Sequence, residues 1–172
     1  MGESFHFDDA RAMHAVTVGP PGQRVFFLQF CANASSHPAR WVNLKLEKQQ
    51  VAALADHLDA LLVDLPPTIE VHNLEVRQPD EIAWIVGALG AAYDQTEDRI
   101  IVVAEELVDT DEDGEPLLDD DEGQGMLTVR LTRSQVRVFI DGARDLIARG
   151  RPDCPWCGRP MDVTGHLCPR MN

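Results

Sequence analysis

The sequence has few positive charges, no long apolar run and no apolar signal region near its start. Its 172 residues hold 15 Lys+Arg against 29 Asp+Glu, a formal net charge of −14. Nucleic-acid binders and proteins that dock on anionic lipid need a basic surface, so both classes are disfavoured. The longest apolar run, residues 82–93, has 12 residues including two glycines, whereas a membrane span needs roughly 20. With its acidic N-terminus, this predicts a soluble cytoplasmic protein without membrane contact.

The negative charge is unevenly distributed along the chain. From Arg130 onward there are eight arginines and four aspartates, a net of +4, so the first 129 residues carry −18. Apolar residues make up 44% of the chain, which is enough for a core and excludes full disorder. The length fits one domain, or one domain with a small appendage.

Alternating and apolar patterns predict strands, and two apolar stripes at helical spacing predict helices. The expected strands cover 15–18, 24–31, 41–46, 81–93, 99–107 and 125–131, with polar connections at 32–40 and 68–80. The first helix, with its stripe from Val51 to Leu62, ends before Pro66-Pro67. The second covers 132–149, with Thr132 as its N-cap and Gly150 at its end.

The two halves of the sequence can be aligned with each other. V-N-L-K-L-E-K-Q-Q-V at 42–51 matches L-T-V-R-L-T-R-S-Q-V at 127–136, an offset of 85, and the strands that begin at Arg24 and Arg99 correspond at an offset of 75. We therefore predict an α+β fold of two βββα repeats, with mainly antiparallel sheet and both helices on one face. Residues 1–149 would form this domain and residues 150–172 a separate tail.

The C-terminal tail carries the strongest chemical motif, C-P-W-C-G followed by G-H-L-C-P. Three thiolates and one imidazole favour Zn²⁺, and four protein ligands make a closed, structural site. The predicted ligands are Cys154, Cys157, His166 and Cys168. The alternatives are a metal-free tail and a C-x-x-C redox pair. Trp156, Met161 and Val163 are expected to dock the tail on the main domain.

An acidic segment, residues 109–122, is the second motif, with nine acids among 14 residues. Asp109, Asp111 and Asp113 match the front half of a calcium loop, but Asp120 and Pro116 depart from its back half. A solvated hairpin loop is the simplest interpretation; calcium binding and a partner-binding acidic patch are the alternatives.

The remaining candidate residues favour structural roles. Cys31 is expected to be a buried small side chain, and His57 to lie on the surface. His6, His14, His37, His57 and His72 have no metal-ligand spacing. Glu105 and Glu106 fit exposed acids at a strand end, with a catalytic carboxylate pair as the alternative. No nucleophile elbow or glycine-rich phosphate loop is present in the sequence.

The chain resembles the actinobacterial domain-of-unknown-function family 3090 over nearly its whole length. The resemblance rests on T-V-G-P-P-G-Q-R-V-F-F-L-Q at 17–29, L-E-K-Q-Q-V-A-A-L at 46–54, L-T-R-S-Q-V-R-V-F at 131–139, and above all the cysteine/histidine tail at 150–172. It implies a cytoplasmic bacterial protein with a zinc tail, and no activity.

With no catalytic constellation beside the expected metal site, the sequence favours a non-enzymatic adaptor that binds another protein. A metal-dependent hydrolase, in which water replaces His166 or Cys168, is the first alternative. The second is RNA contact through C-terminal arginines, although the acidic remainder makes nucleic acid an unfavoured partner. These arginines are Arg133, Arg137, Arg144, Arg149, Arg151, Arg159 and Arg170. The sequence does not fix an oligomeric state.

Overall fold

The computed structural model describes residues 2–34, 37–68, 76–109, 123–150, 154–159, 161 and 166–170. Its strands are β1 (Phe5–Phe7), β2 (Ala10–Val18), β3 (Val25–Ala34), β4 (His37–Leu46), β5 (Val86–Asp94), β6 (Arg99–Glu106) and β7 (Met126–Leu131). Its helices are α1 (Lys48–Leu62) and α2 (Arg133–Ala148). No helix in these ranges is long and apolar enough to cross a membrane.

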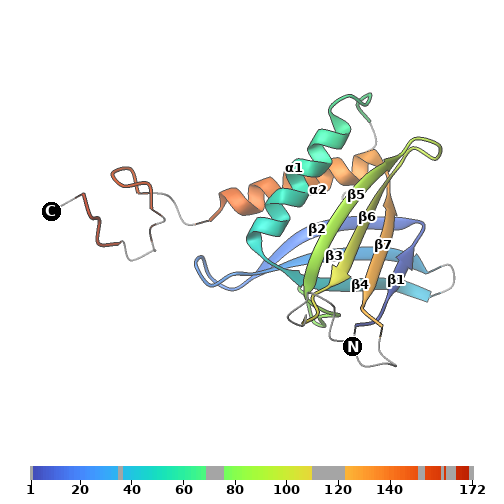
Figure 1. Cartoon of the computed structure of the whole chain (residues 1–172), viewed down its shortest axis with the longest axis horizontal. Helices are drawn as coiled ribbons and strands as arrows, with labels where there is room; N and C mark the ends of the chain where they lie inside the picture. The colour runs from blue at the N-terminus through green and yellow to red at the C-terminus, as the bar shows by residue number, and fades with distance from the viewer. Residues whose placement is uncertain are drawn as a thin grey trace.

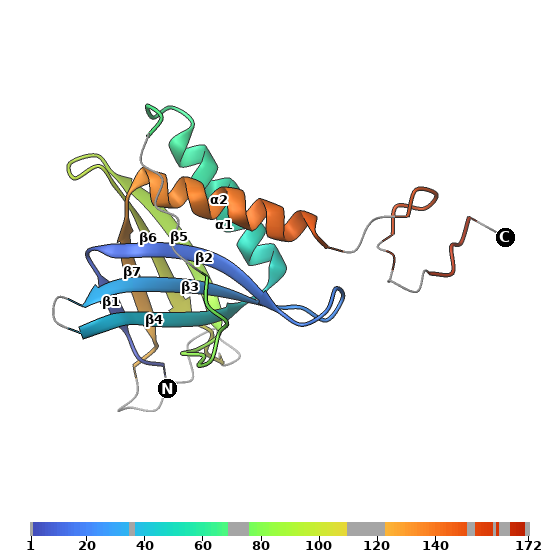
Figure 2. The same cartoon turned by 180° about the vertical axis from the view of Figure 1, so that it is seen from behind.

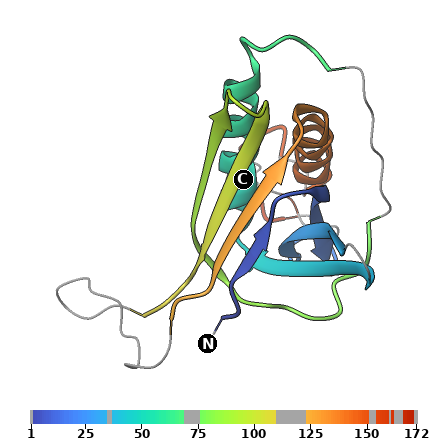
Figure 3. The same cartoon turned by 90° about the vertical axis from the view of Figure 1, so that its right-hand side faces the viewer.

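The strands form two sheets that run across one another (Figure 1, Figure 3). One sheet is the antiparallel meander β2-β3-β4, and the other has the order β1-β7-β6-β5. Within the second sheet, only the short strand β1 pairs in parallel, with β7. The prediction of an α+β fold with mainly antiparallel sheet and two helices is confirmed, with two separate sheets in place of one.

Each helix begins with a capping box whose glutamine also reaches a strand of the other half. Gln50 accepts a hydrogen bond from the backbone N–H of Glu47 and donates to the carbonyls of Val86 and Gly87. In the second half, Gln135 accepts from Thr132 N–H and donates to the carbonyls of Ala10 and Arg11. In both cases the accepting carbonyls lie at a β-bulge that opens the first strand of a meander.

The inner faces of both sheets and the apolar stripes of both helices enclose one core. Phe30 of β3, Leu58 of α1, Val129 of β7 and Phe139 of α2 are all at most 1% exposed and belong to a single cluster. The two helices pack against each other; among the strands, α1 contacts mainly β5 and α2 mainly β2, so each helix covers the sheet of the other half (Figure 2). The core therefore cannot form from one half alone.

Side-chain amides attach the connection between the halves to the outer face of β3 and β4. Gln29 exchanges two hydrogen bonds with the backbone of Arg77, at 3.0 and 3.1 Å. Asn43 donates to the carbonyl of Glu81 at 2.9 Å, and its carbonyl oxygen accepts the 2.7 Å hydrogen bond from Gln29 Nε2. Both amides are at most 3% exposed, so this network satisfies buried polar groups that would otherwise be costly.

Several predicted boundaries were wrong. β2 begins at Ala10 and not at residue 15, β3 and β4 occupy much of the expected loop at 32–40, and β5 begins only at Val86. Residues 82–85 run beside β4 as an extended segment, with Lys45 N–H donating to the carbonyl of Trp84. β1 has only three residues, too short a run for periodicity to reveal. β2–β4 with α1, and β5–β7 with α2, are each three strands followed by a helix, and β1 precedes the first set; their origin by duplication stays a prediction.

Candidate metal centre

The first pair of candidate ligands lies on a tight turn. Gly158 N–H donates to the carbonyl of Cys154 at 2.8 Å, and Cys154 N–H donates to the carbonyl of Arg159 at 2.8 Å. Gly158 adopts φ +70°, a conformation that is unfavourable for residues with a Cβ. The turn brings the side chains of Cys154 and Cys157 to the same side, as a metal site requires.

The second pair, His166 and Cys168, completes the cluster from nine and eleven residues after Cys157. The Sγ atoms of Cys154 and Cys168 lie 3.8 Å apart, and Cys157 Sγ lies 3.2 Å from His166 Nε2. All four ligand atoms fall within 4.8 Å of one another. A tetrahedral zinc ion about 2.3 Å from each sulfur would place two sulfurs roughly 3.8 Å apart. The four residues can therefore hold a metal ion of this kind.

The backbone favours negative charge on the first of these sulfurs. Burial acts to raise the pKa of Cys154, but hydrogen bonds from the backbone N–H groups of Cys157 and Trp156 and from neighbouring thiols outweigh it, so the pKa lies below the usual value. Cys157 receives the N–H of Arg159, which acts to lower its pKa; burial and the adjacent sulfurs outweigh that effect and raise the pKa. A divalent cation would relieve the repulsion between the thiolates.

Two apolar side chains of the tail are exposed, although the sequence predicted that the tail would dock on the main domain. Trp156 is 62% exposed and Leu167 is 99% exposed, so the expected docking of Trp156 on the main domain is wrong. Met161 is partly buried, and Val163 lies outside the described residues. In Figures 1 and 2 the described parts of the tail lie beyond the end of α2, apart from the sheets and helices. Arg170 donates to the carbonyl of Trp156 at 3.1 Å, which ties the two ends of the tail together.

The other candidate residues do not join the cluster. Cys31 is buried, as expected, at 2% exposure. His57 lies on the surface of α1, also as expected, with Nε2 2.9 Å from the carbonyl oxygen of Ala91. Glu106, expected to be exposed, is half-buried. Its carboxylate accepts a hydrogen bond from the N–H of Gly125 at 2.9 Å, so it makes a structural contact. The acidic segment beyond Asp109, and with it the calcium prediction, lies outside the described residues.

Most arginines proposed for RNA contact already face carboxylates. Arg133 contacts Asp98, Arg137 contacts Asp59, Arg144 contacts Asp56 and Asp59, and Arg149 contacts Asp145. These contacts neutralise the basic face of α2 that an RNA backbone would need.

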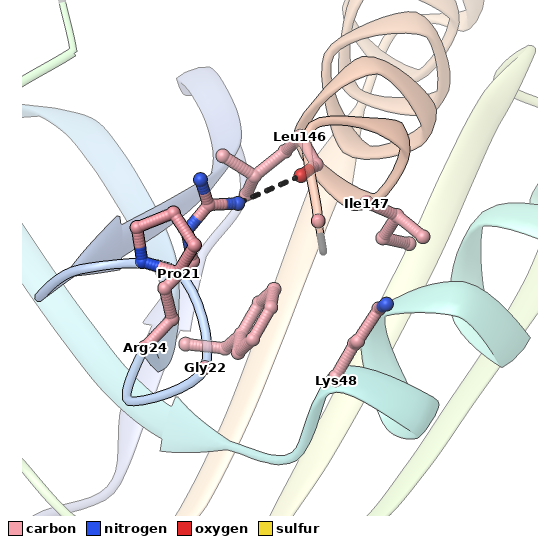
Figure 4. Close-up of a pocket in the computed structure, with 8 residues that line it drawn as sticks. Pro21, Gly22, Arg24, Lys48, Leu146 and Ile147 are labelled. Carbon is pink, nitrogen blue, oxygen red and sulfur yellow. Dashed lines mark hydrogen bonds between the residues drawn. The ribbon is translucent and has the colours of Figure 1, made fainter. Parts of the chain in front are cut away.

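The structure also brings together two cationic side chains that the sequence did not predict to meet. Arg24 and Lys48 line one cavity at the end of α2 (Figure 4). They are 24 residues apart, on a hairpin and at a helix start, and no local motif links them.

Comparison with known proteins gives a family and no activity. Residues 5–168 match the model of the family described as "Protein of unknown function (DUF3090)". No curated protein matches the chain.

Proposed function

Because the chain belongs to DUF3090, a family of unknown function, and its Cys/His cluster can hold a metal ion, we propose that it is a cytoplasmic, zinc-binding adaptor. In this proposal the zinc ion is structural and the bound partner is another protein. The observation that carries it is the convergence of three sulfurs and one imidazole nitrogen within 4.8 Å.

The donor set supports zinc and a structural role. Soft thiolates combined with imidazole in a tetrahedral arrangement are typical of Zn²⁺. Four protein ligands leave no coordination position for a catalytic water, whereas catalytic zinc sites use three protein ligands. This difference favours an adaptor over the metal-dependent hydrolase.

The exposed apolar side chains of the tail support a protein partner. Trp156 is the second residue after the first ligand, and Leu167 lies between the last two ligands. A metal ion would therefore fix the positions of both side chains. Tryptophan is enriched among the residues that dominate protein–protein binding energy.

Metal analysis of the full chain tests the site. We expect one zinc ion per chain, and at least a tenfold loss of zinc affinity in Cys157→Ser and in His166→Gln. Cys31→Ala and His57→Gln are matched controls outside the cluster and should retain zinc. Adding azide to the cobalt-substituted protein should leave its visible spectrum unchanged, because azide needs an open position. Azide binding would contradict the closed site and favour the hydrolase.

Partner binding tests the adaptor role. Proteins that co-purify with the full chain should be lost in Trp156→Ala, which leaves the four ligands in place, and also after zinc removal. Partners that remain bound to both would show that the tail is not the binding surface.

A further inference from the structure

A cavity of about 180 Å³ lies where the β2–β3 hairpin meets the end of α2 and the start of α1. Figure 4 shows Arg24 and Lys48 on opposite sides of it, with Pro21 and the side chains of Leu146 and Ile147 around them. Arg24 makes one long hydrogen bond, 3.5 Å from Nη1 to the carbonyl of Leu146. Lys48 Nζ comes close to Gly150, where a Cβ atom would lie 3.4 Å away.

Two positive charges thus share one cavity, whose lining combines polar atoms with the apolar side chains of Phe26, Leu146 and Ile147. Among the described residues, neither Arg24 nor Lys48 has a carboxylate within 4.0 Å. This contrasts with the arginines of α2, which face aspartates. The carbonyls at the end of α2 favour nearby cations, but an arginine has five N–H donors, and a single long hydrogen bond leaves most of them available.

The other half of the molecule has a corresponding corner with different residues. Arg24 directly precedes Val25, the first paired residue of the second hairpin strand; Asp98 directly precedes Arg99, which has the same place in the β5–β6 hairpin. The structure therefore aligns Arg24 with Asp98, one residue away from the alignment with Arg99 that the sequence predicted. Lys48 is the first residue of α1, and Arg133 is the first residue of α2. Two cations in one corner therefore correspond to an acid and a cation in the other.

In that second corner, the carboxylate of Asp98 neutralises the Arg133 guanidinium. Arg133 Nε and Nη2 lie 2.8 and 2.9 Å from the two carboxylate oxygens of Asp98, and Arg133 Nη1 donates to the carbonyl of Pro66 at 2.5 Å. Tyr93 donates its hydroxyl to Asp98 at 2.8 Å. The Arg133 guanidinium, followed by the Tyr93 hydroxyl, holds the pKa of Asp98 below its usual value. The pair thus combines one hydrogen bond, from Nη2 to Oδ2, with a close approach of Nε to Oδ1 that is not a hydrogen bond.

We propose that the cavity between Arg24 and Lys48 binds a small organic acid, whose carboxylate neutralises these cations as the Asp98 carboxylate neutralises Arg133 in the other corner. The guanidinium and the ammonium bind the carboxylate, and the walls formed by Phe26, Leu146 and Ile147 contact a short aliphatic body. The volume of about 180 Å³ accommodates the short aliphatic chain of such an acid. This binding is independent of the zinc tail.

Titration of the full chain with 3-methylbutanoate, followed by amide NMR, tests the proposal. We expect saturable shifts at Gly22, Lys48 and Gly150, which surround the cavity. The neutral isostere 3-methylbutanamide should bind at least tenfold more weakly, because it lacks the charge. Inorganic phosphate should also bind at least tenfold more weakly, because it has no aliphatic body; equal binding would overturn the assignment to an organic acid.

Two variants supply the missing carboxylate from the protein itself. Arg24→Asp recreates the acid–cation pair of the other corner, and Lys48→Glu does so with the charges exchanged, at an exposed position. Each should weaken 3-methylbutanoate binding at least tenfold. Arg11→Asp makes the same change in net charge at an exposed residue at the other end of β2 and should retain binding. If one variant fails to fold, the other still decides.

Retention of affinity within threefold in both folded variants, or equal shifts with the acid and its amide, would overturn the site. An affinity loss in Arg11→Asp as large as in Arg24→Asp would also overturn it, because net charge alone would then explain the binding.

Discussion

At the scale of single residues, His14 departs most from the expectations for a buried polar group. It lies on β2, is 8% exposed, and its Nε2 atom has no hydrogen-bond partner in the part of the chain that the structure describes. Burial lowers the pKa of His14 below its usual value, because a low-dielectric environment disfavours the imidazolium. The sequence offered no sign of this, since a histidine in an alternating strand fits either face.

The buried His14 predicts a pH-dependent stability. In the unfolded chain it takes up a proton below about pH 6.5, whereas the folded state keeps it neutral to lower pH, so the unfolded state binds more protons in this window. Stability should therefore be full above pH 6.5 and fall as the pH drops toward the folded-state pKa. Urea unfolding of wild type and His14→Leu at pH 7.5 and 5.5 measures this. In His14→Leu, the free energy of unfolding should fall less between pH 7.5 and pH 5.5 than in wild type. In His57→Gln, which changes an exposed histidine, it should fall as much as in wild type. An equal fall in His14→Leu and wild type would contradict the prediction.

At the scale of elements, side chains in the first turn of each helix connect the two halves of the chain by hydrogen bonds. Gln135 is 8% exposed and donates to Ala10 and Arg11 at 2.8 and 2.9 Å, while Gln50 makes longer contacts of 3.2 and 3.3 Å from a half-buried position. A capping box accounts for glutamine at N3, but the additional contact with a bulge in the other half depends on the tertiary fold.

Substitution of Gln135 separates the two roles. Gln135→Glu keeps an oxygen that accepts the Thr132 N–H but removes the donor to the two bulge carbonyls, which then face a carboxylate. We expect a loss of about 2–3 kcal/mol in the free energy of unfolding, from two lost hydrogen bonds at a buried site. Gln50→Glu should lose less, since water reaches its partners. Equal, small losses in urea denaturation of both variants would indicate that only the capping role matters.

At the scale of the whole molecule, we expect the Cys/His tail and the core to be stabilised separately. From Cys154 onward, the hydrogen bonds among the described residues stay within the tail, and a segment this short cannot form an apolar core. In the proposed function, metal binding therefore supplies its folding free energy. The core has its own packing and should not depend on the metal.

Removal of zinc should unfold the tail and leave the core intact. We expect EDTA to change the fluorescence of Trp156 while the thermal unfolding midpoint of the main domain stays the same. Trp156→Phe identifies the origin of the signal, because Trp41 and Trp84 belong to the main domain. A fall of the midpoint on addition of EDTA would show that the tail stabilises the core.

Features that depend on residues close together in the sequence could be predicted, and features that depend on distant residues could not. The stripe of α1, the Thr132 cap of α2 and the C-x-x-C turn are local, so spacing alone revealed them. The start of β5 was missed because residues 82–85 are apolar and extended but pair only sparsely, beside β4. β1 was missed because three residues carry no measurable period.

By itself, the sequence determined the type of every element except β1, the mainly antiparallel pairing and the four residues of the candidate metal centre, because these follow from the period of apolar residues within each segment, the order of the segments and the Cys/His motif. Only the tertiary structure decided that each helix covers the sheet of the other half, that Trp156 stays exposed, and that Arg24 and Lys48 meet at one cavity. These features depend on which apolar faces bury one another. That choice is made by packing across the whole chain, which no local pattern records.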